Sequence, residues 1–243
     1  MTRRIAILGG AGGIGRAVVA ASQAAGDEVV VLDLPASIER HRLDVASIGI
    51  DVLSEDAVAA AASRLAERWP TLDGFVNLAG YNAKLQPLVE TSTAYFDDVI
   101  AGNLRGAFLS TKAILPLMAD GGSIVMVSSG LARFIRPGYG SYATAKAGLI
   151  AFANTLALEC APRLRVNTVA PGLVDTAFLR GGTGRSDETG DSVVDFAPYL
   201  AAIPLKRLAT PEDVAGPIRF LLGPDSAYMT GQVLWINGGA YLP

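Results

Sequence analysis

Residues 5–15 read Ile5-Ala6-Ile7-Leu8-Gly9-Gly10-Ala11-Gly12-Gly13-Ile14-Gly15, a short apolar run followed at once by a cluster of glycines. Glycines at this spacing let the backbone turn tightly between a first strand and a first helix. A helix that begins there offers free N–H groups and the positive end of its dipole, which suits a pyrophosphate. The spacing differs from the commoner Gly-x-Gly-x-x-Gly, and a tight turn that binds nothing is the other interpretation. We predict a strand–turn–helix unit that binds a dinucleotide at its turn.

The rest of the chain alternates short apolar runs with longer segments of helical period. The predicted strands are Ile5–Leu8, Glu28–Leu32, Gly74–Asn77, Ser123–Val127, Arg165–Val169 and Val233–Ile236, and the predicted long helices are Ile14–Ala25, Glu55–Arg68, Asn103–Met118, Tyr142–Cys160 and Pro211–Leu222. Strands that are apolar throughout are buried on both faces beneath helices. The alternation therefore predicts an α/β fold with a doubly wound parallel sheet. No repeat or linker divides the chain, so we expect one domain over residues 1–243.

Composition excludes several classes of partner. The chain has 243 residues and a net charge of −3, which gives no electrostatic case for nucleic acid or an anionic membrane surface. No apolar stretch approaches the roughly 20 residues of a membrane span, and residues 5–8 are too few for a signal-peptide core. Cys160 and His41 are the only cysteine and histidine, so a disulfide and a zinc-type site both lack ligands. We expect a cytoplasmic protein without a metal, nucleic-acid or membrane partner.

Asp33 ends the second predicted strand, about 20 residues after the glycines. A carboxylate at this place can accept hydrogen bonds from the hydroxyls of an adenosine ribose, and it would repel a 2′-phosphate. Position 12, among the glycines, is Gly12 and not a basic residue that would bind such a phosphate. The sequence therefore favours NAD over NADP. The alternative is that Asp33 only caps the next turn, beside Pro35.

Tyr142 and Lys146 are four residues apart at the start of a predicted helix, so they share one face. The ordinary pKa of tyrosine, near ~10, is too high for an efficient proton shuttle at neutral pH. A nearby ammonium group lowers that pKa, which Lys146 can supply, although such pairs also occur by chance. Tyr139 has no such partner, because the residue four further on is Ala143. We therefore predict that Tyr142 is the acid/base.

As a set, these residues resemble the short-chain dehydrogenase/reductase family in its single-domain form. The motifs that carry the resemblance occur in order over essentially the whole chain: the glycines of residues 9–15, Asp51-Val52, Asn77-Leu78-Ala79-Gly80, Asn103, Ser128-Ser129, Tyr142-Ala143-Thr144-Ala145-Lys146, Arg165-Val166-Asn167, Ala170-Pro171-Gly172 and residues 231–239. One departure is Leu8, where many members have threonine. The resemblance implies a Rossmann-type sheet of about seven strands in the order 3-2-1-4-5-6-7, with helices on both faces.

The resemblance also implies roles for four catalytic residues. Tyr142 is expected to exchange a proton with the substrate oxygen, and Ser129 to hydrogen-bond the same oxygen. Lys146 is expected to lower the pKa of Tyr142 and to hold the hydroxyls of the nicotinamide ribose. Asn103 is expected to hold a water that links Lys146 to solvent.

The cofactor residues follow from the same resemblance. Asp51 and Val52 are expected against the adenine, Asn77 to Gly80 beside the sheet and cofactor, and Val174 and Thr176 at the nicotinamide carboxamide. The full set expected to bind NAD is Gly9, Gly13, Ile14, Gly15, Asp33, Asp51, Val52, Asn77, Ala79, Gly80, Tyr142, Lys146, Pro171, Gly172, Val174 and Thr176.

The substrate pocket is expected where the carboxyl ends of the strands meet the loop after Pro171-Gly172. The expected lining residues are Ser129, Gly130, Leu131, Phe134, Arg136, Tyr142, Leu173, Phe178 and Leu179. They are mostly apolar, which suits a substrate with a hydrocarbon or ring body. Arg133 and Arg136 either contact a carboxylate or polyol or are simply exposed to solvent. Residues 177–205 form the expected substrate loop, and their glycine-rich part, residues 181–191, is predicted to be a lid that is disordered without ligand.

The prediction is an NAD-dependent oxidoreductase that acts on a secondary alcohol or ketone. A 3-oxoacyl thioester reductase is one alternative, against which Asp33 argues because that reduction usually draws on NADPH. A non-catalytic NAD-binding sensor or scaffold is another. The family resemblance also suggests a homotetramer with interfaces along Asn103–Met118, Tyr142–Cys160 and the C-terminal strand.

Overall fold

The computed structural model describes residues 2–180, 184 and 197–242. Its centre is a parallel sheet of seven strands: β1 (Arg4–Leu8), β2 (Glu28–Asp33), β3 (Ala46–Gly49), β4 (Leu72–Asn77), β5 (Met118–Val127), β6 (Arg165–Pro171) and β7 (Val233–Ile236). The strands lie in the order β3-β2-β1-β4-β5-β6-β7, and every neighbouring pair is parallel. The predicted doubly wound sheet and its strand order are confirmed.

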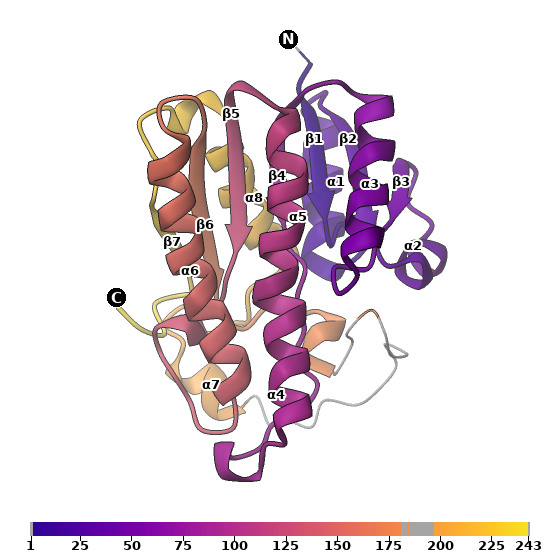
Figure 1. Cartoon of the computed structure of the whole chain (residues 1–243). Helices are drawn as coiled ribbons and strands as arrows, with labels where there is room; N and C mark the ends of the chain where they lie inside the picture. Colours follow the sequence, from indigo (N-terminus) through magenta and orange to yellow (C-terminus); the bar gives the residue numbers. More distant parts are fainter. Residues whose placement is uncertain (1, 181–183, 185–196, 243) are drawn as a thin grey trace.

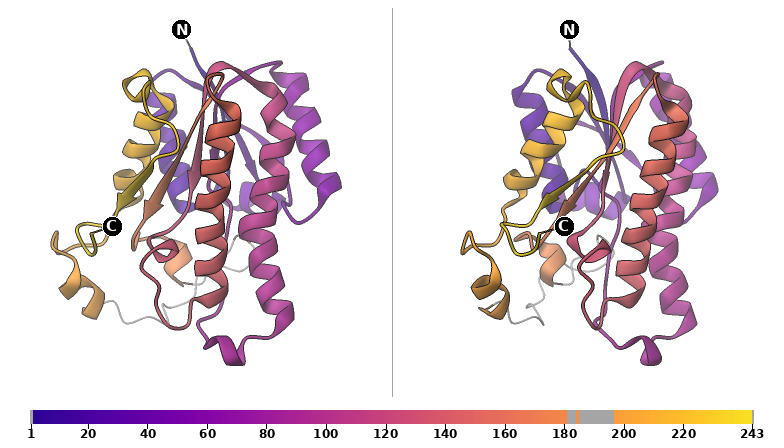
Figure 2. Two further views of the ribbon diagram at one scale, coloured as in Figure 1. Left: turned by 60° about the vertical axis from the view of Figure 1, so that its left-hand side comes forward. Right: turned by 90° about the vertical axis from the view of Figure 1, so that its left-hand side faces the viewer.

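Helices cover both faces of this sheet (Figures 1 and 2). One face carries α1 (Gly13–Ala24) and α8 (Pro211–Leu222), and the other carries α3 (Glu55–Arg68), α5 (Gly106–Ile114) and α6 (Gly140–Cys160). Alternate residues of β1 serve the two layers, with Ile5 and Ile7 packed in the core under α1 and α8, and Ala6 and Leu8 in the core on the other face. This double burial is the reason that β1 is apolar throughout.

The remaining elements are short. They are α2 (Pro35–His41), α4 (Thr93–Ile100), the π-helix η2 (Ala101–Arg105), α7 (Ala197–Ala202) and the 3₁₀ segments η1 (Leu88–Glu90), η3 (Leu115–Leu117), η4 (Gly130–Ala132), η5 (Ala177–Arg180) and η6 (Pro224–Ser226). No helix of the described residues is long and apolar enough to cross a membrane.

The structure corrects both ends of the helix predicted over Asn103–Met118, since α5 ends at Ile114 and Met118 already begins β5, and it adds elements. The helix expected to start at Asn103 begins at Thr93, where the Ser92 side chain accepts a hydrogen bond from the Tyr95 N–H at 3.3 Å, and it runs through η2 into α5. Asn103 therefore lies inside this long helical segment. The elements α2 and β3 were not predicted from the sequence. The strand β3 gives a weak signal because it is only four residues long and is not rich in β-branched residues.

The carboxyl ends of the strands point to the lower edge of the sheet in Figure 1, and the loops that carry most of the motifs leave from this edge. The strand order reverses between β1 and β4, because β2 and β3 extend to one side of β1 and the later strands to the other. In open α/β sheets, ligands bind in the crevice at such a switch point.

The burial of Leu65 in α3 gives a stability test. Its side chain is fully buried in the core that α3 shares with β4 and β5. Leu65→Ala should lower the free energy of unfolding by about 2–5 kcal/mol, since it removes buried methyl groups and leaves a cavity. Urea unfolding monitored by circular dichroism measures this change. Arg64→Ala, at an exposed position of the same helix, should change it by less than about 0.5 kcal/mol; equal losses in both variants would contradict the assigned helix face.

Candidate active site

The turn between β1 and α1 requires glycine for reasons of space. Gly9 has a φ of +79°, and its N–H donates to the Leu32 carbonyl at 2.8 Å. A Cβ on Gly15 would lie 2.2 Å from the Gly9 carbonyl oxygen, and a Cβ on Gly13 would lie 2.6 Å from the Thr176 Cγ2. The backbone of the turn therefore packs on itself and on the segment after β6, which leaves the start of α1 open to a ligand.

Asp33 faces this turn from the end of β2. Its carboxylate accepts hydrogen bonds from the Ala11 N–H at 2.8 Å and from the Leu34 N–H at 2.8 Å. The second bond lies at the start of α2, as the capping interpretation expects, but the first spans the crevice to the glycine turn. The carboxylate is thus held by two backbone donors beside the cavity that Asp33 helps to line.

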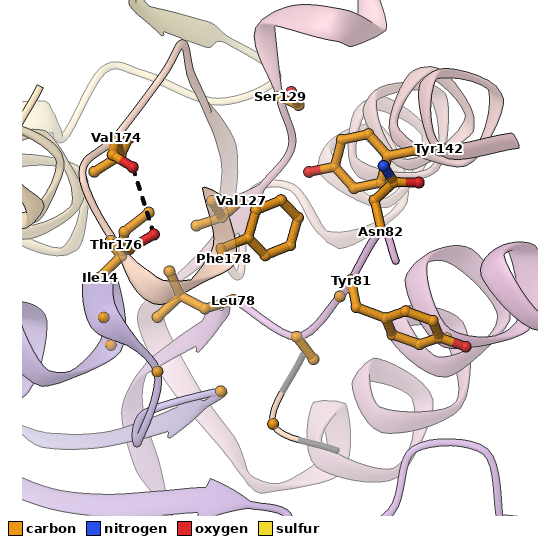
Figure 3. Close-up of a pocket in the computed structure, with 18 of the residues that line it drawn as sticks. Ile14, Leu78, Tyr81, Asn82, Val127, Ser129, Tyr142, Val174, Thr176 and Phe178 are labelled. Atoms are coloured by element: carbon orange, nitrogen blue, oxygen red, sulfur yellow. Dashed lines mark hydrogen bonds between the residues drawn. The ribbon is translucent and has the colours of Figure 1, made fainter. Parts of the chain in front are cut away.

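The main cavity has a volume of about 430 Å³ and runs from the glycine turn to Phe178 (Figure 3). It is lined by every residue expected to bind NAD except Asn77, and by Ser129, Leu131, Leu173, Phe178 and Leu179 of the expected substrate set. Asn77 lies buried behind the cavity, where its Oδ1 accepts the Ala79 N–H at 3.1 Å. Asn77 therefore shapes the loop after β4 and does not line the cavity.

Tyr142 lies in the first turn of α6, and its hydroxyl points into the cavity on the side of Phe178 (Figure 3). The two rings are 6.0 Å apart between centroids. Burial raises the pKa of Tyr142 above its ordinary value, and a hydrogen bond with the Ser129 side chain lowers it in part. Ser129 is itself oriented by the Leu131 N–H, which donates to its Oγ at 3.2 Å.

Lys146 is buried one turn further along α6. Its Nζ donates to the Val127 carbonyl at 3.1 Å and lies 5.6 Å from the centroid of the Tyr142 ring. Burial lowers the pKa of Lys146 to about 8. The site thus places a phenol whose burial opposes ionisation beside an amine whose burial opposes protonation.

Asn103 is fully buried in η2 and does not line the cavity. Its Nδ2 donates to the Val99 carbonyl at 2.9 Å and to the Tyr81 carbonyl at 2.8 Å, and its Oδ1 accepts the Tyr81 N–H at 3.1 Å. A Cβ on Gly80 would lie 2.3 Å from the Asn103 Oδ1 and 2.9 Å from the Lys146 Nζ. Asn103, Gly80 and Lys146 therefore meet at one point, and the role of Asn103 in a relay stays a prediction.

A second cavity of about 240 Å³ adjoins the first. Ser129, Leu131, Tyr139, Pro171, Gly172 and Leu173 line both. Gly130, Phe134 and Arg136, expected in the substrate pocket, line the second cavity and not the main one, whereas Arg133 lines neither. The expected substrate residues are therefore divided between two adjoining spaces.

Several lining residues were missed in the sequence. Tyr81 and Asn82 line the main cavity directly after Gly80 (Figure 3), and their place next to a recognised motif was the available signal. Tyr139 precedes α6 and lines both cavities, although it lacks a lysine partner. Tyr241 lines the second cavity from the far end of the chain, and no local pattern marks it.

Two further expectations concern the predicted lid and metal binding. Apart from Gly184, the predicted lid of residues 181–191 lies outside the described residues. Gly184 has its carbonyl 3.4 Å from the Ser37 Oγ, which donates to it across the cavity mouth. Within the described residues, no group of three or more His, Cys, Asp or Glu side chains could hold a metal ion.

Known proteins match the chain along its length. Residues 9–241 match the family model described as enoyl-(acyl carrier protein) reductase. An uncharacterised short-chain type dehydrogenase/reductase of Sinorhizobium fredii is 36% identical in an alignment that covers 98% of this chain and 43% of that protein. The chain thus spans less than half the length of this relative. A 3-oxoacyl-(acyl-carrier-protein) reductase of Thermotoga maritima is 34% identical, over 96% of this chain and 95% of that protein.

A solved structure matches equally widely. The crystal structure of a 3-ketoacyl-(acyl-carrier-protein) reductase from Brucella melitensis complexed with NADH has a TM-score of 0.87 at 26% identity, covering 99% of this chain and 98% of that chain. The sheet order, the ordered motifs and these full-length matches agree, and the chain belongs to the short-chain dehydrogenase/reductase family.

Proposed function

We propose that this protein is an NAD-dependent oxidoreductase that interconverts a secondary alcohol and a ketone, with Tyr142 as the acid/base. The observation that carries the proposal is the convergence of Tyr142, Ser129 and Lys146 on the same cavity as the glycine turn. The proposed dinucleotide site and the proposed proton donor thus line the same cavity.

The residues of the main cavity fit a nicotinamide dinucleotide. The start of α1 supplies free N–H groups for a pyrophosphate, and Asp33 supplies a carboxylate for ribose hydroxyls. When bound, the cofactor supplies or accepts the hydride. The charge of Asp33 disfavours a 2′-phosphate, which supports NAD over NADP.

The proton chemistry belongs to the chain's own side chains. For reduction, the Tyr142 hydroxyl donates its proton to the carbonyl oxygen while Ser129 hydrogen-bonds the same oxygen. The raised pKa of Tyr142 keeps the hydroxyl protonated at neutral pH, which is the form that this direction needs. Lys146, with a pKa of about 8, can then return a proton to Tyr142, and Asn103 would hold the water that resupplies Lys146.

A 3-oxoacyl thioester reductase remains the second candidate. The relatives from Thermotoga maritima and Brucella melitensis carry this description, and the latter was crystallised with NADH. Asp33 favours NAD, but a reductase of this description can also bind NADH. The preference for NAD that we propose is therefore only weak evidence against this candidate. Turnover of a 3-oxoacyl thioester, compared with simple ketones, separates the two.

The assembly and location are also proposals. Phe108 on α5 and Leu158 on α6 are exposed apolar side chains, with 45% and 82% of their surface accessible. Burying such faces between copies supports a homotetramer with interfaces along α5, α6 and β7. We propose that it works in the cytoplasm on a small-molecule substrate.

Replacing the acid/base tests the enzyme hypothesis. Tyr142→Phe should lower kcat about 10²- to 10⁴-fold, because it removes the proton donor. Its Kd for NADH, measured by fluorescence titration, should stay unchanged because the ring remains. Absorbance of NADH, followed over a panel of ketones and 3-oxoacyl thioesters, measures turnover. Tyr228→Phe, at an exposed position, is the matched control. Full activity in Tyr142→Phe would refute the assignment, and NADH binding without turnover by the wild type would favour the sensor hypothesis.

Asp33→Asn tests cofactor selection. Removing the charge should lower the ratio of kcat/KM for NAD to kcat/KM for NADP by roughly 10- to 100-fold, since a unit charge near a phosphate contributes one to a few kcal/mol. Asp44→Asn, at an exposed site away from the cavity, should leave the ratio unchanged. A wild-type enzyme that prefers NADP would show that Asp33 does not select the cofactor.

The buried amine predicts a pH-dependent stability. The pKa of Lys146 is about 8 in the folded protein and near ~10.4 in an unfolded chain, so unfolding takes up a proton between these values. The contribution of Lys146 to the free energy of unfolding therefore rises as pH increases from 8 to 10. The wild type should gain on the order of 1–2 kcal/mol over Lys146→Met in this window, measured by urea unfolding without cofactor. Lys112→Met, an exposed substitution, should run parallel to the wild type; a flat difference for Lys146→Met would mean that Lys146 is solvated.

A further inference from the structure

The second cavity is walled mainly by apolar side chains. Those that form it are Leu131, Phe134, Leu173, Ile203, Leu205 and Ile236. Its volume of about 240 Å³ is below the roughly 300–1,000 Å³ of a whole ligand site, which suits one part of a substrate. Since Ser129 lines both cavities, a substrate whose reacting oxygen binds Ser129 can extend its body into this space.

The C-terminal segment forms part of the wall of this cavity through Tyr241. The Tyr241 ring stacks on Phe134 at 3.7 Å between centroids, and Trp235 meets both rings edge-on at 6.2 Å. A Cβ on Gly130 would lie 1.7 Å from the Tyr241 hydroxyl oxygen, so only glycine lets the tyrosine pack directly after Ser129. Three aromatic side chains are therefore packed against one another beside this cavity.

Charge is distributed unequally among the described residues that line this cavity. Arg207 is paired with Asp213 through two hydrogen bonds of 2.5 Å and 2.9 Å, so its charge is neutralised. Arg136 makes no ion pair with a described residue. No acid besides Asp213 is among the described lining residues, so the cavity carries a net positive charge at Arg136.

The Arg136 side chain is oriented by aromatic contact. Its guanidinium carbon lies 5.4 Å from the centroid of the Tyr199 ring. A guanidinium over the face of an aromatic ring is attracted by the ring's electrons, and this contact holds the Arg136 side chain against α7. Tyr139 lies near enough for Arg136 to lower its pKa, against the larger effect of burial. Tyr139 and Arg136 thus place a phenol and a guanidinium close together on the wall of the second cavity.

We propose that Arg136 binds a carboxylate of the substrate, so that the preferred substrates are oxo acids or hydroxy acids with an apolar body. The proposal rests on the proposed function and names its substrate class. A carboxylate matches the guanidinium edge with two parallel charge-assisted hydrogen bonds. A neutral polyol fits less well, because the apolar walls would strip its hydroxyls of water without replacing their hydrogen bonds.

Matched ketones test this proposal. The probes are 4-oxocyclohexanecarboxylate and 3-(4-oxocyclohexyl)propanoate, each paired with its neutral carboxamide and assayed with NADH. The wild type should favour at least one acid over its amide by about 10- to 100-fold in kcat/KM. Arg136→Gln should remove this preference mainly by raising KM for the acid, so that the ratio of kcat/KM for the acid to kcat/KM for the amide falls to about 1. Arg136→Lys should restore part of the preference, and Arg133→Gln should keep all of it, because Arg133 lines neither cavity.

Calorimetric titration of each acid into the enzyme–NADH complex gives a readout that does not depend on turnover. The acid should bind the wild type more tightly than it binds Arg136→Gln. Equal preference for acid and amide, or reduction of other ketones but of neither acid, would overturn the carboxylate proposal and leave the proposed function standing. NADH binding with no turnover of any ketone or thioester would instead overturn the proposed function, and this inference with it.

Discussion

The hydrogen bonds between the Asn103 side chain and the Tyr81 backbone hold the catalytic end of the molecule together. They join the loop after β4 to the helix that passes from α4 through η2 into α5. Gly80, with a φ of +151°, fits between the Asn103 amide and the Lys146 amine because it has no Cβ. The π-helical turn lets the Asn103 side chain also take up the Val99 carbonyl. The loop after β4, the helix through η2 and the Lys146 side chain of α6 therefore meet at one glycine.

Burial gives the two titratable groups opposite tendencies. It raises the pKa of Tyr142 and lowers that of Lys146, so in the folded protein both favour their neutral forms more than they would in water. The sequence suggested a simpler arrangement, in which the lysine charge lowers the pKa of the tyrosine. In the structure the Lys146 Nζ lies 5.6 Å from the Tyr142 ring centroid, and burial is the largest influence on the pKa of Tyr142. With a pKa of about 8, Lys146 is still mostly protonated at neutral pH, so it can return a proton to a Tyr142 phenolate without creating a second buried charge.

What could be predicted from sequence was governed by local geometry. The glycine turn, Asp33 and the apolar strands each follow from a backbone approach or a burial pattern that a few neighbouring residues reveal. The start of the long helix at Thr93 was not predicted, although Ser92 supplies an N-cap side chain directly before it. Arg133 and Arg136 are the same residue type three positions apart, so the sequence left both open. Only the path of the chain after Ser129 places Arg136, and not Arg133, against the second cavity.

The two cavities are built from different parts of the chain. Similarity to known proteins is therefore more informative about the cofactor than about the substrate. Backbone contacts shape the cofactor end, where a Cβ on Gly13 or Gly15 would collide with its surroundings, so distant relatives can share it. Side chains from the β5–α6 connection, α7 and the C-terminal segment shape the substrate end, and these can change without disturbing the sheet. The family assignment therefore extends to hydride transfer, whereas the names of relatives leave the substrate open. The charged side chains constrain the choice of ligand more directly. Asp33 lines the main cavity and Arg136 lines the second, and contacts with neighbouring residues orient each side chain. In the proposed function the Asp33 carboxylate repels an additional anion on the cofactor, and in the further inference Arg136 attracts an anion on the substrate.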